Sequence, residues 1–286
     1  MKLLSYQSPT GPRSAAVRDG AYVDLNQVDA SLPTSVRELL ALGSEGRARA
    51  QAAAQSGATF GPEGVQLLPP IVDPQKVICV GLNYADHARE SGMQPPPEPV
   101  LFCKFPTSIA AHGDAIVLPP ESQEVDYEAE LVVVIGRRGR RIAESEALDY
   151  VGGYCCGHDV SARDWQLRKP GGQWLMGKTF DTFAPFGPYL VTADEVPNPN
   201  QLAIELRLNG TTMQRSTTAE FIFRVEPLIA YISNVCTLLP GDLLFTGTPA
   251  GVGAARKPPV FLRPGDMAEV EIAGLGLLRN TVVAEG

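Results

Sequence analysis

The sequence predicts a β-rich α+β fold, and three observations lead to that prediction. Short runs of apolar and β-branched residues, which are typical of strands, recur at residues 77–80, 131–135, 204–208 and 267–272. The 28 glycines and 25 prolines are spread along the whole chain, where they separate short strands instead of forming a low-complexity tract. Helical patterns are fewer and are expected at residues 84–91, 145–150 and 226–237.

The first 70 residues are predicted to form a small N-terminal α+β domain, 1–70. Strands are expected at residues 3–6 and 21–25, and helices at residues 35–42 and 45–55. Ser35 is expected to cap the first of these helices. Three prolines between residues 69 and 74 then interrupt regular structure. This proline-rich stretch predicts a linker to the rest of the chain.

The later strands have clearer individual signals. Residues 131–135 form a continuous apolar run, which is typical of a strand that is buried on both faces. Residues 204–208 alternate between apolar and polar and end in Asn209-Gly210, a strong signal for a hairpin turn. Residues 267–272 alternate in the same way after a Pro-Gly-Asp turn.

Composition and charge exclude several classes of function. Acidic residues outnumber basic ones by 32 to 24, and the resulting net charge of −8 argues against a general nucleic-acid binder. The basic run at 136–141 is interpreted as a solvated turn. No apolar run of about 18 residues occurs, so no membrane-spanning segment is expected.

Cysteine usage predicts a reduced, cytoplasmic compartment. The five cysteines are odd in number and form no C-x-x-C pair, so most are expected to be small buried apolar residues. The N-terminal residues lack the long apolar core of a signal peptide. Because the chain has only three histidines, a metal site would depend mainly on carboxylate ligands.

The strongest local signal for chemistry is an alternation of acids directly before the apolar run 131–135. In a strand, Asp126, Glu128 and Glu130 would point to the same face. Buried like charges repel each other, and a divalent cation relieves that repulsion. The alternative is an exposed edge strand whose charges serve solubility.

A second signal is the segment 157–164, which follows another apolar run. Asp159 lies where the strand is expected to give way to a helix, as a third carboxylate ligand or as the cap of that helix. Arg163 and Gln166 would share its helical face and suit recognition of a carboxylate. Outside a metal site, such an arginine would be an ordinary surface ion-pair residue.

A third signal combines a histidine with an acid. His87 and Glu90 are three residues apart and are neighbours on a helix, where the carboxylate would orient the imidazole for water activation. The alternative is an incidental pair on a surface helix. The Pro-rich stretch 91–99 that follows predicts an exposed loop in which a lid could lie.

Two glycine-containing segments complete the candidates. The loop 246–253, which includes Thr248, could present backbone N–H groups to an anion or form a plain tight turn. Residues 172–179 match the phosphate-loop pattern, but no strand precedes them and no helix is expected after them. Lys178 in this segment is instead a candidate cation beside an acidic site.

Taken in order, these motifs resemble those of the fumarylacetoacetate hydrolase superfamily, over about residues 76–286. The likeness to its domain-containing proteins of mitochondria and bacteria rests on residues 122–126, 158–164 and 177–182. The resemblance implies a mixed β-sandwich roll for a catalytic domain at 76–286, with the small N-terminal α+β domain before it, and a homodimer. The founding hydrolase has a further acidic ligand near the position of Asn83. Its absence here argues against fumarylacetoacetate as the substrate.

The resemblance also implies roles for individual residues. It assigns Mg²⁺ or Mn²⁺ to three metal ligands, which are Glu128, Glu130 and Asp159. It assigns the α-keto acid end of the substrate to Lys178, Arg163, Gln166 and the backbone around Thr248. It assigns water activation to a lid dyad of His87 and Glu90. Three carboxylates would then be balanced by one divalent ion and one lysine.

The leading hypothesis is a metal-dependent hydrolase that cleaves a C–C bond in a small 2,4-dioxo acid of the acylpyruvate type. The same site chemistry would also suit an oxaloacetate decarboxylase or a keto–enol tautomerase, because each reaction develops negative charge next to a keto group. A non-catalytic protein that binds a metal or a small ligand is the alternative from a different class. In each case the expected partner is a small keto acid.

Overall fold

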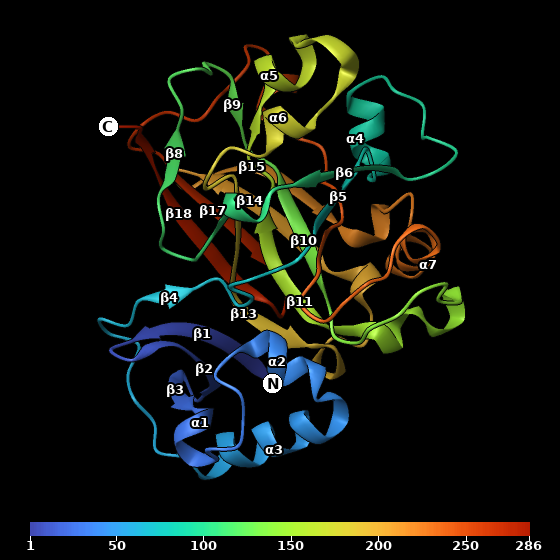
Figure 1. The fold of residues 1–286 in the computed structure, drawn as a ribbon. Helices are drawn as coiled ribbons and strands as arrows, with labels where there is room; N and C mark the ends of the chain where they lie inside the picture. The colour runs from blue at the N-terminus through green and yellow to red at the C-terminus, as the bar shows by residue number, and fades with distance from the viewer.

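The computed structural model covers residues 1–286 and places two β-sheets face to face (Figure 1). The larger sheet has 11 strands, and its main path runs in the order β3 (Ala21–Asp24), β2 (Gly11–Arg18), β1 (Lys2–Ser8), β13 (Ala184–Thr192), β11 (Val151–His158), β10 (Ala129–Ile135), β16 (Leu243–Phe245), β5 (Val77–Gly81) and β6 (Val100–Lys104). Two short strands lie off this path, with β4 (Leu67–Leu68) paired to β1 and β7 (Ile109–Ala110) paired to β13.

The smaller sheet has five strands and covers one face of the larger sheet. Its order is β15 (Thr211–Thr217), β14 (Ala203–Leu208), β17 (Met267–Ile272), β18 (Gly276–Ala284) and β8 (Ile116–Leu118). A separate two-stranded ladder joins β9 (Val125–Asp126) to β12 (Ser161–Ala162). The β-rich α+β class predicted from the sequence is therefore confirmed.

Seven α-helices surround the sheets, and they fall into three groups in Figure 1. At the bottom of the view, against the first strands, lie α1 (Leu25–Val28), α2 (Val36–Ala41) and α3 (Gly43–Ser56). At the top lie α4 (Ala85–Glu90), α5 (Arg163–Arg168) and α6 (Leu175–Lys178), while α7 (Val225–Val235) lies at the side. No helix combines the length and the hydropathy that crossing a lipid bilayer requires.

Strand β10 is the structural centre of the molecule, and all of its residues are buried. Leu131 and Val133 belong to a core of 36 buried residues that includes the space between the two sheets. Val132 and Val134 belong to a second core of 20 residues, which includes α2 and α3. The continuous apolar run predicted a strand buried on both faces, and these two cores confirm it.

The N-terminal segment is joined to the rest of the chain by strand pairing as well as by packing. Strand β1 pairs antiparallel with β13, with Leu3 opposite Leu190. The second core contains residues from both parts, among them Leu39 and Phe186. Residues 1–70 thus extend the larger sheet, and the division into two domains at residue 70 stays a prediction.

Most expected elements form close to their predicted places, with one change of type. The turn after β14 has positive φ at Asn209 and Gly210, 52° and 76°, as the hairpin signal requires. The helix expected at 145–150 is instead a 3₁₀ helix, Glu144–Tyr150. This segment is a short connector that leads directly into β11, a setting in which 3₁₀ geometry is common.

Candidate active site

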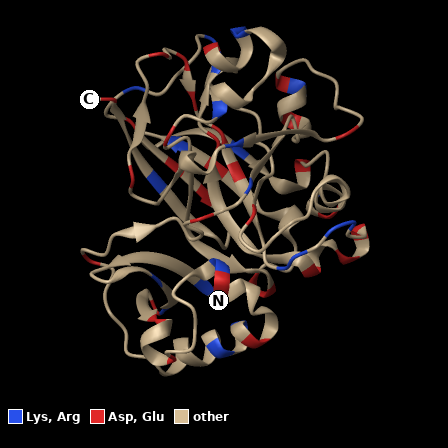
Figure 2. Ribbon diagram, viewed as in Figure 1, with Lys and Arg blue, Asp and Glu red and all other residues tan.

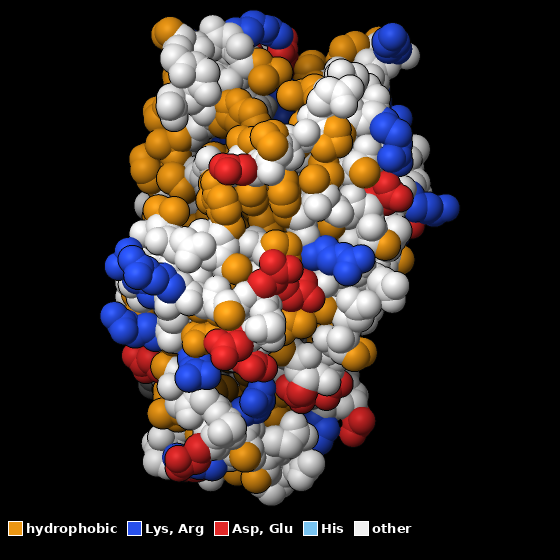
Figure 3. All heavy atoms as spheres, turned by 90° about the vertical axis from the view of Figure 1, so that its right-hand side faces the viewer, with side chains coloured by type: hydrophobic (Ala, Val, Ile, Leu, Met, Phe, Trp, Pro, Cys, Tyr) orange, Lys and Arg blue, Asp and Glu red, His pale blue; other side chains and the backbone are white.

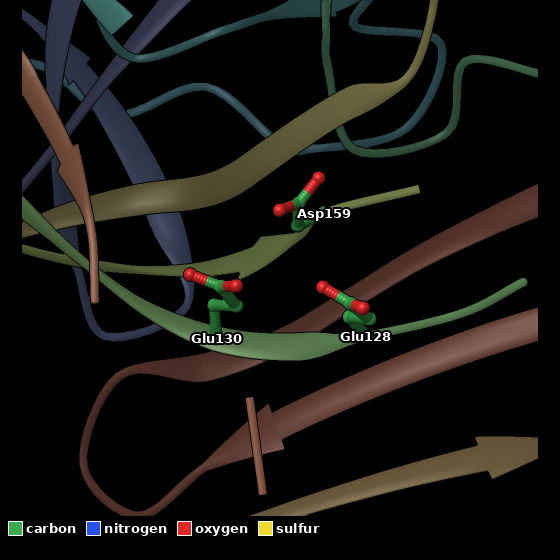
Figure 4. Close-up of side chains that lie close together, drawn as sticks. All are labelled: Glu128, Glu130 and Asp159. Atoms are coloured by element: carbon green, nitrogen blue, oxygen red, sulfur yellow. The ribbon is translucent and has the colours of Figure 1, made fainter. Parts of the chain in front are cut away.

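Three buried carboxylates lie together where β10 and β11 meet (Figure 4). Glu128 directly precedes β10, Glu130 lies within it, and Asp159 directly follows β11. The two strands are antiparallel neighbours, and the Asp159 N–H donates to the Glu128 carbonyl at 2.9 Å. One ligand oxygen from each carboxylate lies within 4.8 Å of the others. Strand pairing therefore brings together residues that are 29 to 31 positions apart.

Asp126 does not join this cluster of three carboxylates, although Arg163 contacts both Asp126 and Glu128. The strand is interrupted, because β9 ends at Asp126 and β10 begins only at Ala129. The Asp126 carboxylate accepts hydrogen bonds from the N–H groups of Gly253 and Ala254, at 2.7 and 3.0 Å. It also accepts one from Arg163 Nε at 2.8 Å. Asp126 thus supports the arginine and the glycine-rich loop.

The alternative in which Asp159 caps the following helix is wrong. Helix α5 begins at Arg163, and its N-cap is Ala162, which makes no side-chain capping hydrogen bond. Asp159 is followed by β12, so a short strand separates it from the helix. Its carboxylate is fully buried and pairs with lysines instead of helix N–H groups.

The carboxylates are paired with three cations. Lys178 Nζ lies 2.7 Å from Glu128 Oε2 and 2.9 Å from Asp159 Oδ2. Arg163 lies 2.6 Å from the other Glu128 oxygen, and Lys104 lies 2.6 Å from Asp159 Oδ1. The predicted balance, in which a single lysine accompanies three carboxylates, is therefore wrong because it omits Lys104 and Arg163. Figure 2 shows acidic segments on the central strands as well as on the helices.

Lys104 is the main residue that the sequence analysis missed. It ends the apolar strand β6, and its side chain is fully buried. A lysine at the end of an otherwise apolar strand was the available signal, since a buried ammonium requires a partner. Gln214 was missed as well. Its side chain donates to Thr248 Oγ1 and Pro249 O, both at 2.8 Å, and accepts from the Ala129 N–H.

Charge pairing shifts the pKa values of the cluster in different directions. Burial alone would raise the pKa of Glu128, but the charges of Lys178 and Arg163 outweigh it and lower the pKa to about 2. Burial and the nearby charges of Asp159 and Glu128 raise the pKa of Glu130 well above its usual value. Burial opposes the charge of Lys178, yet the two carboxylates beside it raise its pKa. Glu130 is thus the carboxyl of the three that lacks a compensating cation.

His87 and Glu90 form the pair that their spacing predicts. His87 Nδ1 lies 3.2 Å from Glu90 Oε2 on α4. The Glu90 carboxylate also accepts the Gly251 N–H, at 2.9 and 3.1 Å to its two oxygens. Burial would raise the pKa of Glu90, but the hydrogen bonds from His87 and Gly251 outweigh it and lower the pKa. The loop 246–253 therefore anchors this pair.

A cavity of about 420 Å³ connects these groups. Its polar lining includes all but one of the predicted site residues, namely His87, Glu90, Glu128, Glu130, Arg163, Gln166, Lys178 and Thr248. Asp159 has no exposed surface and lies behind Lys178. The apolar lining includes Leu82, Phe102, Leu167, Trp174 and Val252. Hydrophobic side chains gather over the upper half of the face shown in Figure 3.

The remaining predicted groups are held by neighbours. Arg163 donates to Gln166 Oε1 at 2.8 Å, so these two side chains form one unit. The Asn83 side chain is occupied by the backbone groups of Phe223 and Thr246, at 2.7 to 3.0 Å. Residues 172–179 pass through a 3₁₀ turn and α6 and follow no strand, in contrast to a phosphate loop.

Comparison with known proteins decides the family. Residues 76–283 match the family model described as Fumarylacetoacetate (FAA) hydrolase C-terminal. The chain belongs to the fumarylacetoacetate hydrolase family. It is 48% identical to the oxaloacetate tautomerase fahd2 of Xenopus laevis, over 99% of this chain and 90% of that protein. The family resemblance inferred from the motifs is thereby confirmed.

Two solved structures of the family have the same fold over the full length of both chains. A fumarylacetoacetate hydrolase from Exiguobacterium antarcticum is 36% identical, with a TM-score of 0.89. A maleylpyruvate hydrolase from Sphingobium, 29% identical with a TM-score of 0.84, was solved in complex with manganese(II) ion and pyruvate. The β-rich, two-sheet architecture is therefore that of the fumarylacetoacetate hydrolase fold.

The cytoplasmic assignment is contradicted. The relative from Xenopus laevis is named as a mitochondrial protein. All five cysteines are free, and three of them are buried, as the sequence analysis expected for most of them. Free thiols report on the redox state of a compartment, however, and they do not distinguish one reducing compartment from another.

Proposed function

We propose that this protein is a Mg²⁺- or Mn²⁺-dependent enzyme that interconverts the keto and enol forms of a small 2-keto acid, with oxaloacetate as the candidate substrate. The observation that carries the proposal is the placement of the groups around one cavity. Glu128, Glu130 and Lys178 line the same cavity as the His87–Glu90 pair. The similarity to the Xenopus laevis protein, which is named as an oxaloacetate tautomerase, supports this choice of substrate.

The residues present fit a hard divalent cation. Glu128, Glu130 and Asp159 supply only oxygen ligands, which Mg²⁺ and Mn²⁺ prefer. Glu130 is buried without a cation beside its carboxylate and accepts only the Gly247 N–H, at 2.8 Å. A cation held by these three residues would supply Lewis-acid polarisation of a carbonyl oxygen. The manganese in the Sphingobium maleylpyruvate hydrolase complex supports this fit.

The chain's own residues supply binding and proton transfer. The Lys178 ammonium and the Arg163–Gln166 unit present hydrogen-bond donors to the carboxylate of a keto acid. In the keto-to-enol direction the His87 imidazole accepts the proton from the carbon next to the keto group and returns it to the keto oxygen. In the enol-to-keto direction it moves the proton from the enol oxygen back to that carbon. Glu90 orients that imidazole through the 3.2 Å contact to Nδ1. The loop at Gly251 fixes Glu90 in turn.

Hydrolysis of an acylpyruvate is the second candidate function, and one observation favours it. The cavity of about 420 Å³ has an apolar wall that includes Phe102 and Trp174. A four-carbon dicarboxylate makes little use of such a wall, whereas an acyl tail would bury apolar surface against it. The His87–Glu90 pair would then activate water instead of moving a proton on carbon.

One experiment distinguishes these functions. The purified protein is mixed with oxaloacetate and with acylpyruvates, first with Mg²⁺ or Mn²⁺ and then with EDTA. Enol formation is followed by ultraviolet absorbance, and release of pyruvate is followed with a coupled dehydrogenase. Metal-dependent enol–keto exchange without pyruvate release supports the tautomerase. Metal-dependent release of pyruvate from acylpyruvates supports the hydrolase. Metal-dependent release of pyruvate from oxaloacetate supports a decarboxylase.

Two further outcomes bear on the proposal. Metal binding without turnover of any keto acid would refute it in favour of a non-catalytic binding protein. Turnover that persists in EDTA would refute the metal requirement. His112 provides a matched control for the dyad, because it is a histidine bonded to the Arg279 N–H and does not line the cavity. The homodimer implied by the family resemblance stays a prediction, which sedimentation analysis tests.

A further inference from the structure

Lys104 is a completely buried lysine at the end of the edge strand β6, with no exposed side-chain surface. Burial of an ammonium group costs free energy unless every donor finds a partner. Lys104 meets this requirement because its three donors bond to three backbone carbonyl oxygens and its charge is paired with one carboxylate. The partners are Asp159, Val160, Lys178 and Phe183.

The contacts of Lys104 differ from those of the other cations in the site. Arg163 and Lys178 line the cavity, whereas Lys104 does not. Lys104 therefore cannot act on a substrate directly. The ammonium instead lies 2.6 Å from Asp159 Oδ1, on the opposite side of the carboxylate from Lys178, which lies 2.9 Å from Oδ2. Asp159 is thus held between two lysines, of which only one reaches the cavity.

Lys104 also fastens the backbone on which the site is built. It donates to the carbonyl of Val160, next to Asp159, at 3.1 Å, and to the carbonyl of Phe183 at 2.8 Å. It donates to the backbone carbonyl of Lys178 as well. The following residue, Phe105, donates its N–H to Thr179 Oγ1 at 2.6 Å. One side chain therefore links the segment after β11 to the end of α6.

We propose that Lys104 is a positioning residue for the metal site. It holds Asp159 Oδ1 and leaves Oδ2 directed toward Lys178, and it fixes the distance between Asp159 and the Lys178 backbone. This inference rests on the proposed function, because it assigns a divalent cation to the cluster. Side chains that orient metal ligands from behind are commonly needed for metal affinity.

The test compares Mn²⁺ binding by wild-type protein and Lys104→Met, using calorimetry and the paramagnetic resonance spectrum of bound Mn²⁺. Loss of the positioning contact should weaken Mn²⁺ binding about 10- to 100-fold and change the spectrum. Lys76→Met is the matched control. Lys76 pairs with the buried Asp242 at 2.7 Å, and neither residue lines the cavity. This control should lose stability without a change in Mn²⁺ affinity.

The outcomes separate the inference from the proposed function. A purely electrostatic role predicts tighter Mn²⁺ binding by Lys104→Met, because a cation next to a ligand is removed. Tighter or unchanged binding by the folded variant would overturn this inference alone. Failure of the wild-type protein to bind Mn²⁺ would overturn the proposed function as well. If Lys104→Met does not fold, Lys104→Gln retains a donor for the carbonyls and should show the same loss of affinity.

Discussion

Replacement of Glu128 by glutamine tests the charge pairing and the ligand assignment together. The carboxylate contacts Lys178 at 2.7 Å and Arg163 at 2.6 Å, and the pKa of Glu128 is lowered to about 2 from its ordinary 4.5. At about 1.4 kcal/mol per pKa unit, this shift corresponds to about 3 kcal/mol of stabilisation of the charged form. Glu128→Gln should therefore lower the melting temperature of metal-free protein by about 6 °C at neutral pH.

The pH dependence of this difference has a definite sign. Because the folded-state pKa of Glu128 is depressed, its stabilisation is present above pH 4.5 and is lost as the pH falls toward about 2. Wild-type protein and Glu128→Gln should therefore converge in stability over that window. Scanning calorimetry of EDTA-treated protein at a series of pH values measures the convergence. Mn²⁺ titration of the same samples should show that the variant no longer binds the metal.

An exposed ion pair provides the control for this experiment. Glu124 pairs with Arg168, whose side chain is 64% exposed, and Glu124→Gln should change the stability by less than about 1 kcal/mol. Equal melting temperatures of wild-type protein and Glu128→Gln at neutral pH would refute the charge argument. Retention of full Mn²⁺ affinity by the variant would refute the assignment of Glu128 as a ligand.

Three further predictions concern the cavity and the core. His87→Ala should lower kcat for enol–keto exchange by about 100-fold or more, with Mn²⁺ affinity unchanged. Steady-state kinetics measures this, with His112→Ala as the control, and equal kcat values for the two variants would contradict the prediction. Gly81→Ala should raise KM and shift the tryptophan fluorescence, because the new Cβ would lie 2.2 Å from the Trp174 ring; an unchanged KM would argue against that wall as part of the site. Burial lowers the pKa of His158 to about 3, so the unfolded chain binds a proton that the folded chain does not, and stability should fall by about 1.4 kcal/mol per pH unit below 6.5. Urea unfolding should show a smaller loss for His158→Leu, and an identical pH slope would exclude this residue as the cause.

The sequence predicted those parts of the fold that depend on local patterns. The apolar run of β10, the hairpin turn at Asn209-Gly210 and the helix at His87 each depend on neighbours a few residues away, and each formed as expected. The proximity of Glu128 and Glu130 could also be predicted in this way, because the two residues flank Ala129, the first residue of β10. Local periodicity therefore placed two of the three clustered carboxylates together.

The remainder required long-range pairing that no local pattern contains. Asp126 lies outside the group of three carboxylates because the chain changes partner, from β12 to β11, within three residues. Lys104 contacts Asp159 across 55 residues of sequence, and Gln214 reaches Ala129 across 85. Each of these contacts depends on which strands and loops become neighbours, and strand order in a sheet is set by the whole chain.

The burial of β10 on both faces gives the N-terminal 70 residues a mechanical role. Val132 and Val134, two and four residues after Glu130, lie in the core that includes α2 and α3. A shortened chain that begins at residue 76 would expose this face of the strand, which Glu130 shares, to water. The strand that carries Glu130 would then lack packing on this face. Its larger fluctuations would vary the distances between the carboxylates on which binding of a cation would depend. The N-terminal residues can therefore stabilise the spacing of the proposed cation ligands without contacting a cation themselves.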